Sequence, residues 1–227
     1  PVTGYLKRIR DICNAHGILL ILDEVMCGMG RTGHTFACAE DRVVPDLIAV
    51  AKGLGAGYQP IGATLVHERI FNAFKDGSGF FQHGHTYMGH PAACAGALAV
   101  QTKIKENGLL SQVRERGEQL VEKLHERFGN HPHIGDIRGR GLFRAIEIVA
   151  DRTTKEPFDP GLKIFAKIKA NAMKEGLVCY PGGGTADGAR GDHVLLAPPF
   201  IISPDELDEL VEKLGNAVDA ALREAGV

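Results

Sequence analysis

The sequence predicts an α/β fold with a mainly parallel sheet, followed by a smaller α+β region. Three short, uninterrupted apolar runs indicate strands, and their apolar character suggests burial on both faces. These runs alternate with segments of helical periodicity, which is the pattern of a parallel sheet covered by helices. Beyond residue 106 the chain becomes more charged, and a second architecture is expected to begin there.

The first part is expected to open with a helix over residues 4–15. Tyr5, Ile9 and Ile12 recur at helical spacing, and Gly17 follows as a stop signal. The other elements expected in this part are strands at residues 18–22, 46–52 and 61–66 and helices at residues 68–74 and 91–106.

The second part is predicted to mix helices with short strands. Ser203 and Glu206 form a capping-box pattern around Pro204, so the last helix is expected to begin there. The other expected elements are helices at residues 110–128 and 161–174, one half-exposed strand within 135–149, and strands at 177–180 and 193–199. The chain is therefore divided into residues 1–106 and residues 107–227.

Composition narrows the class of function. Twenty-six Lys and Arg against 28 Asp and Glu give a formal net charge of −2, so no basic field is expected to attract nucleic acid or an anionic membrane. There is no apolar run long enough to cross a bilayer. The five cysteines form no C-x-x-C pair and are expected to be reduced thiols of a cytoplasmic protein. The chain begins without Met and runs directly into a helix, which suggests a start in mid-domain.

Asp23 and Lys52 each follow a predicted buried strand, at the edge of the sheet where α/β proteins bind ligands. A buried lysine is costly unless its amine is used, for example in a Schiff base. Pyridoxal phosphate needs such a lysine as its anchor, and it needs a carboxylate beside its ring nitrogen. The pair is therefore a candidate pyridoxal phosphate site.

Two other interpretations of these residues are open. Asp23 and Glu24 could simply end a strand, with Lys52 at the surface. An apolar strand ending in Asp-Glu is also typical of P-loop ATPases, but these require a G-x-x-x-x-G-K-[ST] loop, which the 227 residues lack.

Three ordered blocks resemble the signature segments of the class III aminotransferases. They are "GILLILDEVMCGMGRTG", "PDLIAVAKGLGAGYQPIGA" and "HGHTYMGHPAACAGALAV". The resemblance covers the whole chain and implies the aspartate aminotransferase-like fold of pyridoxal-phosphate-dependent transferases. Residues 1–106 would form the C-terminal part of the large, cofactor-binding domain and residues 107–227 the small domain. Family members are about twice as long, so the chain resembles a C-terminal half.

The resemblance also implies roles for single residues. Asp23 would hold the pyridine nitrogen, Val25 would pack against the ring, and Lys52 would form the Schiff base and then shuttle the proton. Thr86 matches a threonine that binds the cofactor phosphate of the neighbouring subunit, which implies a homodimer. From the residues alone, a hydroxyl near glycines suits an ordinary turn as well as a phosphate site.

Two further motifs are interpreted as lacking a ligand of their own. His83, His85 and His90 lie in a glycine-rich loop without nearby Cys or carboxylate residues, so no metal site is expected. The stretch "YPGGGTADGARGDHV" lacks the strand–loop–helix context of a phosphate loop, and a flexible surface loop is expected for most of it.

Arg190 is the candidate ligand for a substrate carboxylate. Many class III enzymes that act on amines or ω-amino acids carry a mobile arginine before "G-D", and a guanidinium suits a planar carboxylate. Here Arg190 directly precedes Gly191, whereas the family pattern usually has two residues between. Leu195 stands where the ornithine and 4-aminobutyrate branch carries its arginine, which counts against that branch. Arg140 is a second candidate.

The function expected from the resemblance is transfer of an amino group from an amine or ω-amino acid to a keto acid such as pyruvate. Asp23 and Lys52 do not by themselves distinguish this reaction from an aminomutase, racemase or decarboxylase-like reaction. A third possibility is a chain that is catalytically incomplete on its own.

Overall fold

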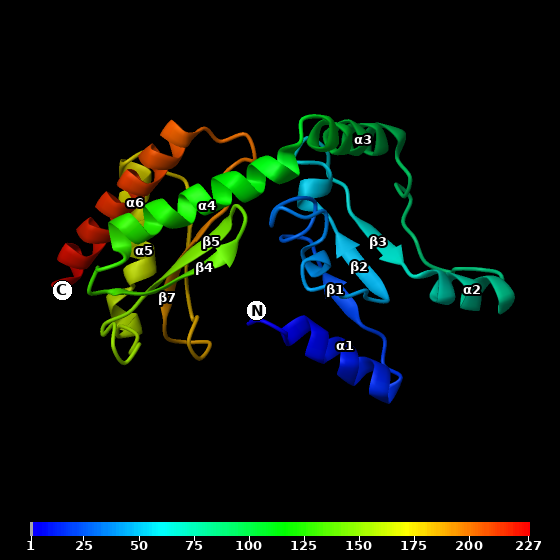
Figure 1. The fold of residues 1–227 in the computed structure, drawn as a ribbon, viewed down its shortest axis with the longest axis horizontal. Coiled ribbons are helices and arrows are strands. Elements are labelled where there is room, and N and C mark those ends of the chain that lie inside the picture. Colours follow the sequence, from blue (N-terminus) through cyan, green and yellow to red (C-terminus); the bar gives the residue numbers. More distant parts are fainter. Residues whose placement is uncertain (1) are drawn as a thin grey trace. The chain divides into compact units, whose positions relative to one another are not determined.

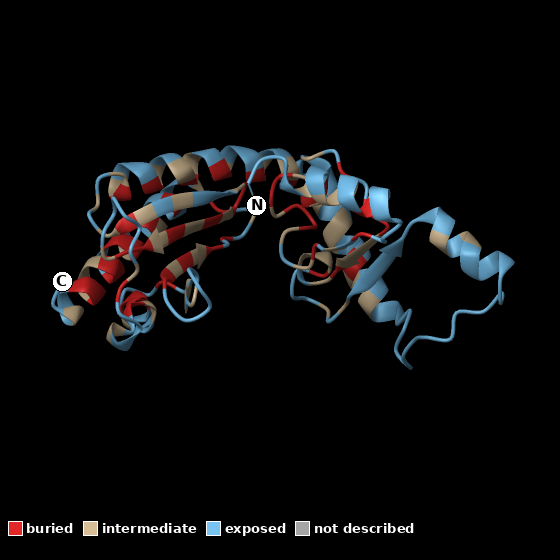
Figure 2. Cartoon of the chain, turned by 90° about the horizontal axis from the view of Figure 1, so that it is seen from below, coloured by how far each residue is buried: buried red, intermediate tan, exposed pale blue. Residues whose placement is uncertain are grey.

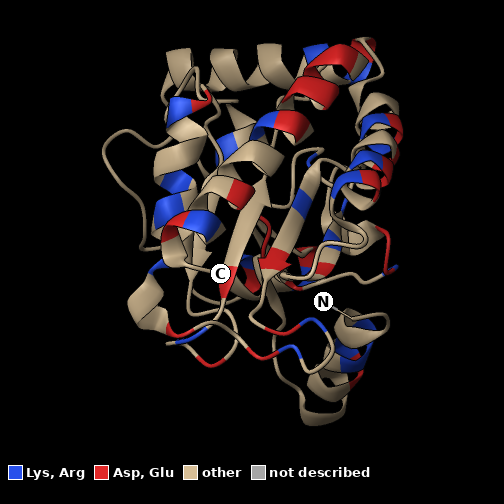
Figure 3. Cartoon of the chain, turned by 90° about the vertical axis from the view of Figure 1, so that its left-hand side faces the viewer, with Lys and Arg blue, Asp and Glu red and all other residues tan. Residues whose placement is uncertain are grey.

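Residues 2–227 are described by a computed structural model, and they divide into two units, residues 2–110 and residues 111–227 (Figure 1). No helix among these residues has both the length and the apolar character needed to cross a membrane. Lys and Arg residues are interspersed with Asp and Glu along the helices (Figure 3).

The first unit is built on a three-stranded sheet of order β1-β2-β3. Strands β1 (Ile21–Asp23) and β2 (Leu47–Val50) are parallel, whereas β3 (Ala63–Val66) runs antiparallel to β2. The α/β class is confirmed. The third strand reverses direction because no crossover helix separates it from β2, and a parallel return needs such a connection. Helices α1 (Tyr5–His16), α2 (Glu68–Asp76) and α3 (Pro91–Glu106) and the 3₁₀ turns η1 (Ala37–Ala39) and η2 (Lys52–Leu54) complete the unit.

The strands of the first unit are less buried than their apolar character predicts. Ile21 of β1 is 62% exposed, and all four residues of β3 are exposed. Figure 2 shows the same contrast, with exposed residues dominating α2, α3 and β3. The expectation of strands buried on both faces is therefore wrong for this chain. The reason is that the unit's buried apolar core is a small cluster of Cys13, Leu20, Cys38 and Val43.

Asp46 holds together the end of the sheet at which β1 and β2 begin. Its buried carboxylate accepts hydrogen bonds from the Arg10 guanidinium of α1 at 2.8 Å, from the Leu20 amide at 2.7 Å, and from Arg69 of α2. Burial alone would raise the pKa of Asp46, but these hydrogen bonds outweigh it and hold the pKa well below its usual range. One side chain thus ties two helices to the sheet.

Replacing Asp46 with Asn is expected to lower the free energy of unfolding at pH 7 by roughly 2–4 kcal/mol, because the largely buried Arg10 guanidinium loses its charged partner. A carboxylate with a depressed pKa stabilises the fold above its unfolded pKa, and this contribution is lost as the pH falls below about 4. The difference between wild type and Asp46→Asn should therefore shrink in acid. Urea unfolding at pH 7 and at pH 3 measures both effects.

The matched control is Asp11→Asn, which breaks the exposed Lys7–Asp11 pair. A surface pair of this kind contributes about 1 kcal/mol or less. Equal losses for the two variants at pH 7 would contradict the bracing role of Asp46.

The second unit is a four-stranded antiparallel sheet of order β4-β5-β7-β6 packed against helices. Strands β4 (Ile134–Arg140) and β5 (Phe143–Ile148) form a hairpin, where the sequence predicted a single strand. The turn at Gly141–Leu142 separates them, and the periodicity continues through β5, which alternates strictly between half-buried and buried residues. The helices are α4 (Leu109–Phe128), α5 (Ile164–Lys174) and α6 (Pro204–Ala225), and a 3₁₀ turn, η3 (Pro160–Leu162), precedes α5.

The glycine-rich stretch after residue 179 is more ordered than predicted. Its first four residues form β6 (Tyr180–Gly183), which pairs with β7 (Asp192–Leu196). The intervening turn is closed by Asp187, whose side chain accepts the amides of Ala189 at 3.0 Å and Arg190 at 2.7 Å. The expectation of a flexible loop therefore fails for β6, because ladder pairing with β7 needs no side chain.

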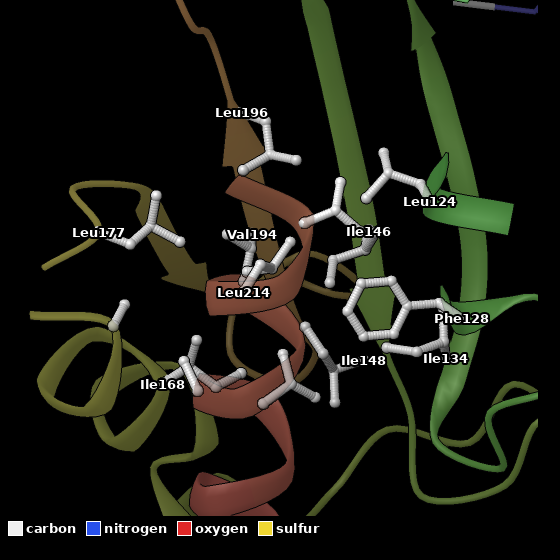
Figure 4. Close-up of a cluster of buried hydrophobic side chains, with 14 of the residues drawn as sticks. Leu124, Phe128, Ile134, Ile146, Ile148, Ile168, Leu177, Val194, Leu196 and Leu214 are labelled. Atoms are coloured by element: carbon white, nitrogen blue, oxygen red, sulfur yellow. The ribbon is translucent and has the colours of Figure 1, made fainter. Parts of the chain in front are cut away.

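Apolar side chains from all three helices meet the sheet in the core of the second unit (Figure 4). Phe128 and Leu214 are fully buried, and so are Ile146 and Val194 from the two central strands. The last helix begins as predicted, with both hydrogen bonds of the Ser203–Glu206 capping box in place. This unit therefore has the substantial core that the first unit lacks.

Candidate active site

The parallel pairing of β1 with β2 brings Asp23 and Lys52 to the same edge of the first unit's sheet. Asp23 is the last residue of β1 and lies in register with Ala49 of β2. Lys52 comes three residues after Ala49 and opens η2. From the usual spacing of strands and the rise per residue, the two Cα atoms lie on the order of 10 Å apart.

The backbone amide of Val25 orients the carboxylate of Asp23. Its Oδ1 accepts a hydrogen bond from the Val25 amide at 3.0 Å. The side chain is exposed, and its Oδ2 has no hydrogen-bond donor among residues 2–227. The backbone thus holds Oδ1, while Oδ2 can accept a hydrogen bond from a ligand.

Lys52 occupies a left-handed backbone conformation, with φ at 39°. A non-glycine residue in this region is uncommon, and such residues concentrate at functional sites. Its turn is held from α3, because the Gln101 amide donates to the carbonyl oxygens of Gly53 at 3.2 Å and Leu54 at 3.0 Å.

The predicted burial of Lys52 is wrong, because its side chain is exposed. Only Val50 of β2 is buried, and the chain turns away from the sheet directly after it. Burial therefore does not identify Lys52 as a functional residue in the described chain. Its position at the carboxyl edge of the sheet and its left-handed backbone conformation do so.

Glu24 is the buried acid of this edge, and no functional role for it is predicted from the sequence. It is 2% exposed, and its two oxygens accept the amides of Ala37 at 2.7 Å and Cys38 at 2.8 Å. The Cys27 thiol donates to the same carboxylate at 3.5 Å. Since successive side chains of a strand point to opposite faces, the adjacent pair Asp23–Glu24 could have suggested one exposed and one buried acid.

Two thiols around Glu24 are held in their protonated form. Burial raises the pKa of Cys27 to about 11 and that of Cys38 to about 12, and the negative charge of Glu24 adds to both shifts. Because the thiolate is the reactive species, both groups should be poor nucleophiles at neutral pH.

We therefore expect alkylation at pH 8 to modify Cys94, which is exposed, much faster than Cys27 or Cys38. Peptide mapping after a timed reaction with iodoacetamide measures each rate. Labelling of Cys38 at the rate of Cys94 would contradict the burial and charge described here. In urea all three should react alike, which provides the control.

The remaining predicted residues of the first unit lie in two different segments. Val25 is half-buried at the start of the loop that follows Asp23. Thr86 lies in the exposed segment between α2 and α3, and no hydrogen bond joins it to Asp23 or Lys52. In the same segment the His90 ring caps α3 by accepting the Ala93 amide. Among residues 2–227, no group of three or more His, Cys, Asp or Glu side chains is arranged to hold a metal ion.

Arg190 belongs to the second unit and sits in the turn between β6 and β7. Its guanidinium contacts Asp187 at 2.8 Å and Glu156 at 2.9 Å. The hydrogen bond and charge of Asp187 raise the pKa of Arg190. The side chain is exposed, and both of its partners are carboxylates.

A large cavity of the first unit lies elsewhere. It has a volume of about 840 Å³, and the residues that line it include Arg10, Asp46 and Arg69 at the amino ends of β1 and β2. Asp23 and Lys52 do not line it. Ligands of α/β sheets bind beyond the carboxyl ends of strands, so the edge with Asp23 and Lys52 is the better candidate.

The residues at this edge fit the ring of pyridoxal phosphate. The group requires an amine for its aldehyde and an acid for its ring nitrogen, and Lys52 and the open Oδ2 of Asp23 provide both from adjacent strands.

Comparison with known proteins places the chain in a family. The profile of the class III aminotransferases matches residues 1–218, and the chain belongs to this family. It is 47% identical to an uncharacterized aminotransferase of Schizosaccharomyces pombe over 98% of its own length and 48% of that protein. The chain thus spans about half the length of such relatives.

Solved structures agree with this assignment. A transaminase from the marine bacterium Virgibacillus superposes with a TM-score of 0.91 at 36% identity, over 100% of this chain and 50% of that one. An amine transaminase from an uncultivated Pseudomonas species, solved with pyridoxal phosphate bound, gives a TM-score of 0.86 at 37% identity, over 100% of this chain and 49% of that one. The fold is therefore that of the pyridoxal-phosphate-dependent transaminases.

Proposed function

We propose that this chain carries the lysine and the ring-binding acid of an aminotransferase that moves an amino group from an amine or ω-amino acid to a keto acid such as pyruvate. The observation that supports this most is the shared edge of Asp23 and Lys52, at the carboxyl ends of two adjacent parallel strands of a class III aminotransferase fold. The similarity to an amine transaminase supports the amine donor.

Bound pyridoxal phosphate supplies an aldehyde that links to amines and a protonated pyridine ring that withdraws electrons from the substrate carbon. Lys52 would hold the group through Nζ, and the same Nζ, once replaced by a substrate amine, would carry the proton of the substrate carbon. Asp23 would keep the ring nitrogen protonated through Oδ2, while the Val25 amide holds Oδ1.

Val25 and Thr86 are proposed as further cofactor contacts. Val25 lies two residues after Asp23, so its side chain is close enough to pack against a ring that Asp23 holds. The Thr86 hydroxyl is exposed in a segment with Gly84 and Gly89, so it is accessible to a phosphate on another subunit. We therefore propose a homodimer in which Thr86 acts across the interface.

The organisation of the whole protein is also a proposal. Residues 1–106 would complete a large cofactor-binding domain and residues 107–227 would form the small domain. The exposed β1 and β3 and the exposed Lys52 are consistent with a site that needs further residues to cover it. A cytoplasmic location fits the five free thiols.

Borohydride reduction of the protein with pyridoxal phosphate is expected to fix the cofactor on Lys52, because only the lysine that forms the Schiff base is trapped. Mass spectrometry of the peptide containing residue 52 detects the product. Lys52→Ala should lose this product and nearly all transamination, whereas Lys75→Ala, a change at an exposed lysine of α2, should lose neither. A trapped cofactor on Lys52→Ala would refute the assignment.

Arg190→Gln is expected to raise KM for ω-amino acids and pyruvate about tenfold or more, because the substrate carboxylate loses its charged partner. KM for an uncharged amine should change little. Steady-state kinetics with both donor types measures the difference. The control is Asp187→Asn, which frees the guanidinium from its nearest partner and should not weaken carboxylate binding. Equal effects on both donors would show that Arg190 is a structural residue of the turn.

A further inference from the structure

Glu24 is a buried acid that the proposed reaction does not use. The hydrogen-bond partners of its carboxylate are all donors: the amides of Ala37 and Cys38 and the thiol of Cys27. Burying a carboxylate is costly unless its oxygens are hydrogen-bonded, and here both are. A group with both oxygens occupied is poorly placed to exchange protons with a substrate, so any role in the reaction must be indirect.

The two amides belong to the first turn of η1, which has no side-chain cap from its own N-cap residue, Phe36. The first amides of a helix lack partners within the helix, and a negative charge there is favourable. Glu24 supplies this cap from 13 and 14 residues earlier in the chain. Its side chain therefore closes residues 25–36 into a loop at the end of β1.

The backbone of this loop also contacts Glu24 directly. The Gly28 amide donates to the Glu24 carbonyl at 2.9 Å. A Cβ at position 28 would come within 2.6 Å of that same oxygen, so the close approach requires glycine. The loop begins with Val25, whose amide holds the Asp23 carboxylate.

The same loop contacts the turn that carries Lys52. Met29 packs so closely on Gly53 that a Cβ added to the glycine would lie 3.0 Å from the Met29 Cβ. The Glu24 amide also donates to the Ala49 carbonyl of β2 at 2.9 Å. Glu24 is thus linked to Asp23 because the two residues are adjacent in the chain. It is linked to the Lys52 turn through its hydrogen bond to β2 and through the contact of Met29 with Gly53.

From this arrangement we infer that Glu24 is a positioning residue, which sets the orientation of Asp23 and the Lys52 turn by anchoring the loop between them. This inference rests on the proposed function, because it assumes that both residues meet pyridoxal phosphate. It assigns Glu24 no contact with the cofactor or substrate.

The main test is Glu24→Gln in the holoprotein. Glutamine has the same shape, but its NH₂ group must face one of the two amides, so one hydrogen bond to a charged acceptor is lost. We expect the affinity for pyridoxal phosphate to fall about tenfold, which is the order expected for one such bond. The pH profile of the lysine-linked cofactor's absorbance should also shift, because a misplaced Asp23 protects the ring proton less well.

Two readouts follow the loop without the cofactor. Hydrogen exchange at the Ala37 and Cys38 amides should accelerate in Glu24→Gln, and Cys27 should be alkylated faster because the nearby charge is gone. The matched control is Glu106→Gln, at an exposed acid in the last turn of α3, which should change none of these quantities.

Gly28→Ala provides a second variant that keeps the carboxylate but forces the loop away from Glu24. It should weaken cofactor binding and shift the same pH profile. If Glu24→Gln does not fold, Glu24→Asp replaces it, since aspartate keeps the charge but is too short to reach both amides. The same shifts are expected from Glu24→Asp.

The inference is overturned if the variants open the loop, as hydrogen exchange would show, while cofactor affinity and the pH profile stay at wild-type values. Glu24 would then be a structural cap only. Failure of the proposed function has a different signature, since the wild-type protein would then show no cofactor linked to Lys52 at all.

Discussion

The parallel pairing of β1 with β2 is the constraint on which the candidate site depends. Parallel strands end at the same edge of a sheet, so the register that places Asp23 beside Ala49 also places Lys52 near Asp23. An antiparallel pairing would send the acid and the lysine to opposite edges. β3, which does run antiparallel, ends at the other edge, where His67 donates its amide to the Asp46 carbonyl.

The two edges of this sheet bury an acid in different ways. At the amino edge, guanidinium groups of Arg10 and Arg69 share the Asp46 carboxylate and tie helices to the sheet. At the carboxyl edge, Glu24 is met by backbone amides and a thiol. Cations beside Asp23 would compete with a ligand for its carboxylate, whereas amides that point at Glu24 leave Asp23 available. The difference suits an edge that binds a cationic ring nitrogen.

The two units differ in how completely they bury their apolar residues. The second has fully buried residues from three helices and the central strands, such as Phe128, Ile146 and Leu214. The first leaves Ile21 and all of β3 exposed. The chain spans about half the length of its relatives, and it is the unit with the candidate site that has the smaller core. The candidate site therefore lies in the unit whose apolar residues are less completely buried.

The sequence by itself determined the class of fold and the candidate pair, because short apolar runs ending in Asp23 and Lys52 carry both signals locally. It also determined the start of α6, since the Ser203 cap depends on residues three positions apart. Tertiary structure decided what depends on distant partners: the direction of β3, the hairpin turn at Gly141, the exposure of Lys52, and the burial of Glu24 against amides 13 and 14 residues away. Local patterns describe which residues favour a strand or a cap, but only the folded chain determines which groups they meet.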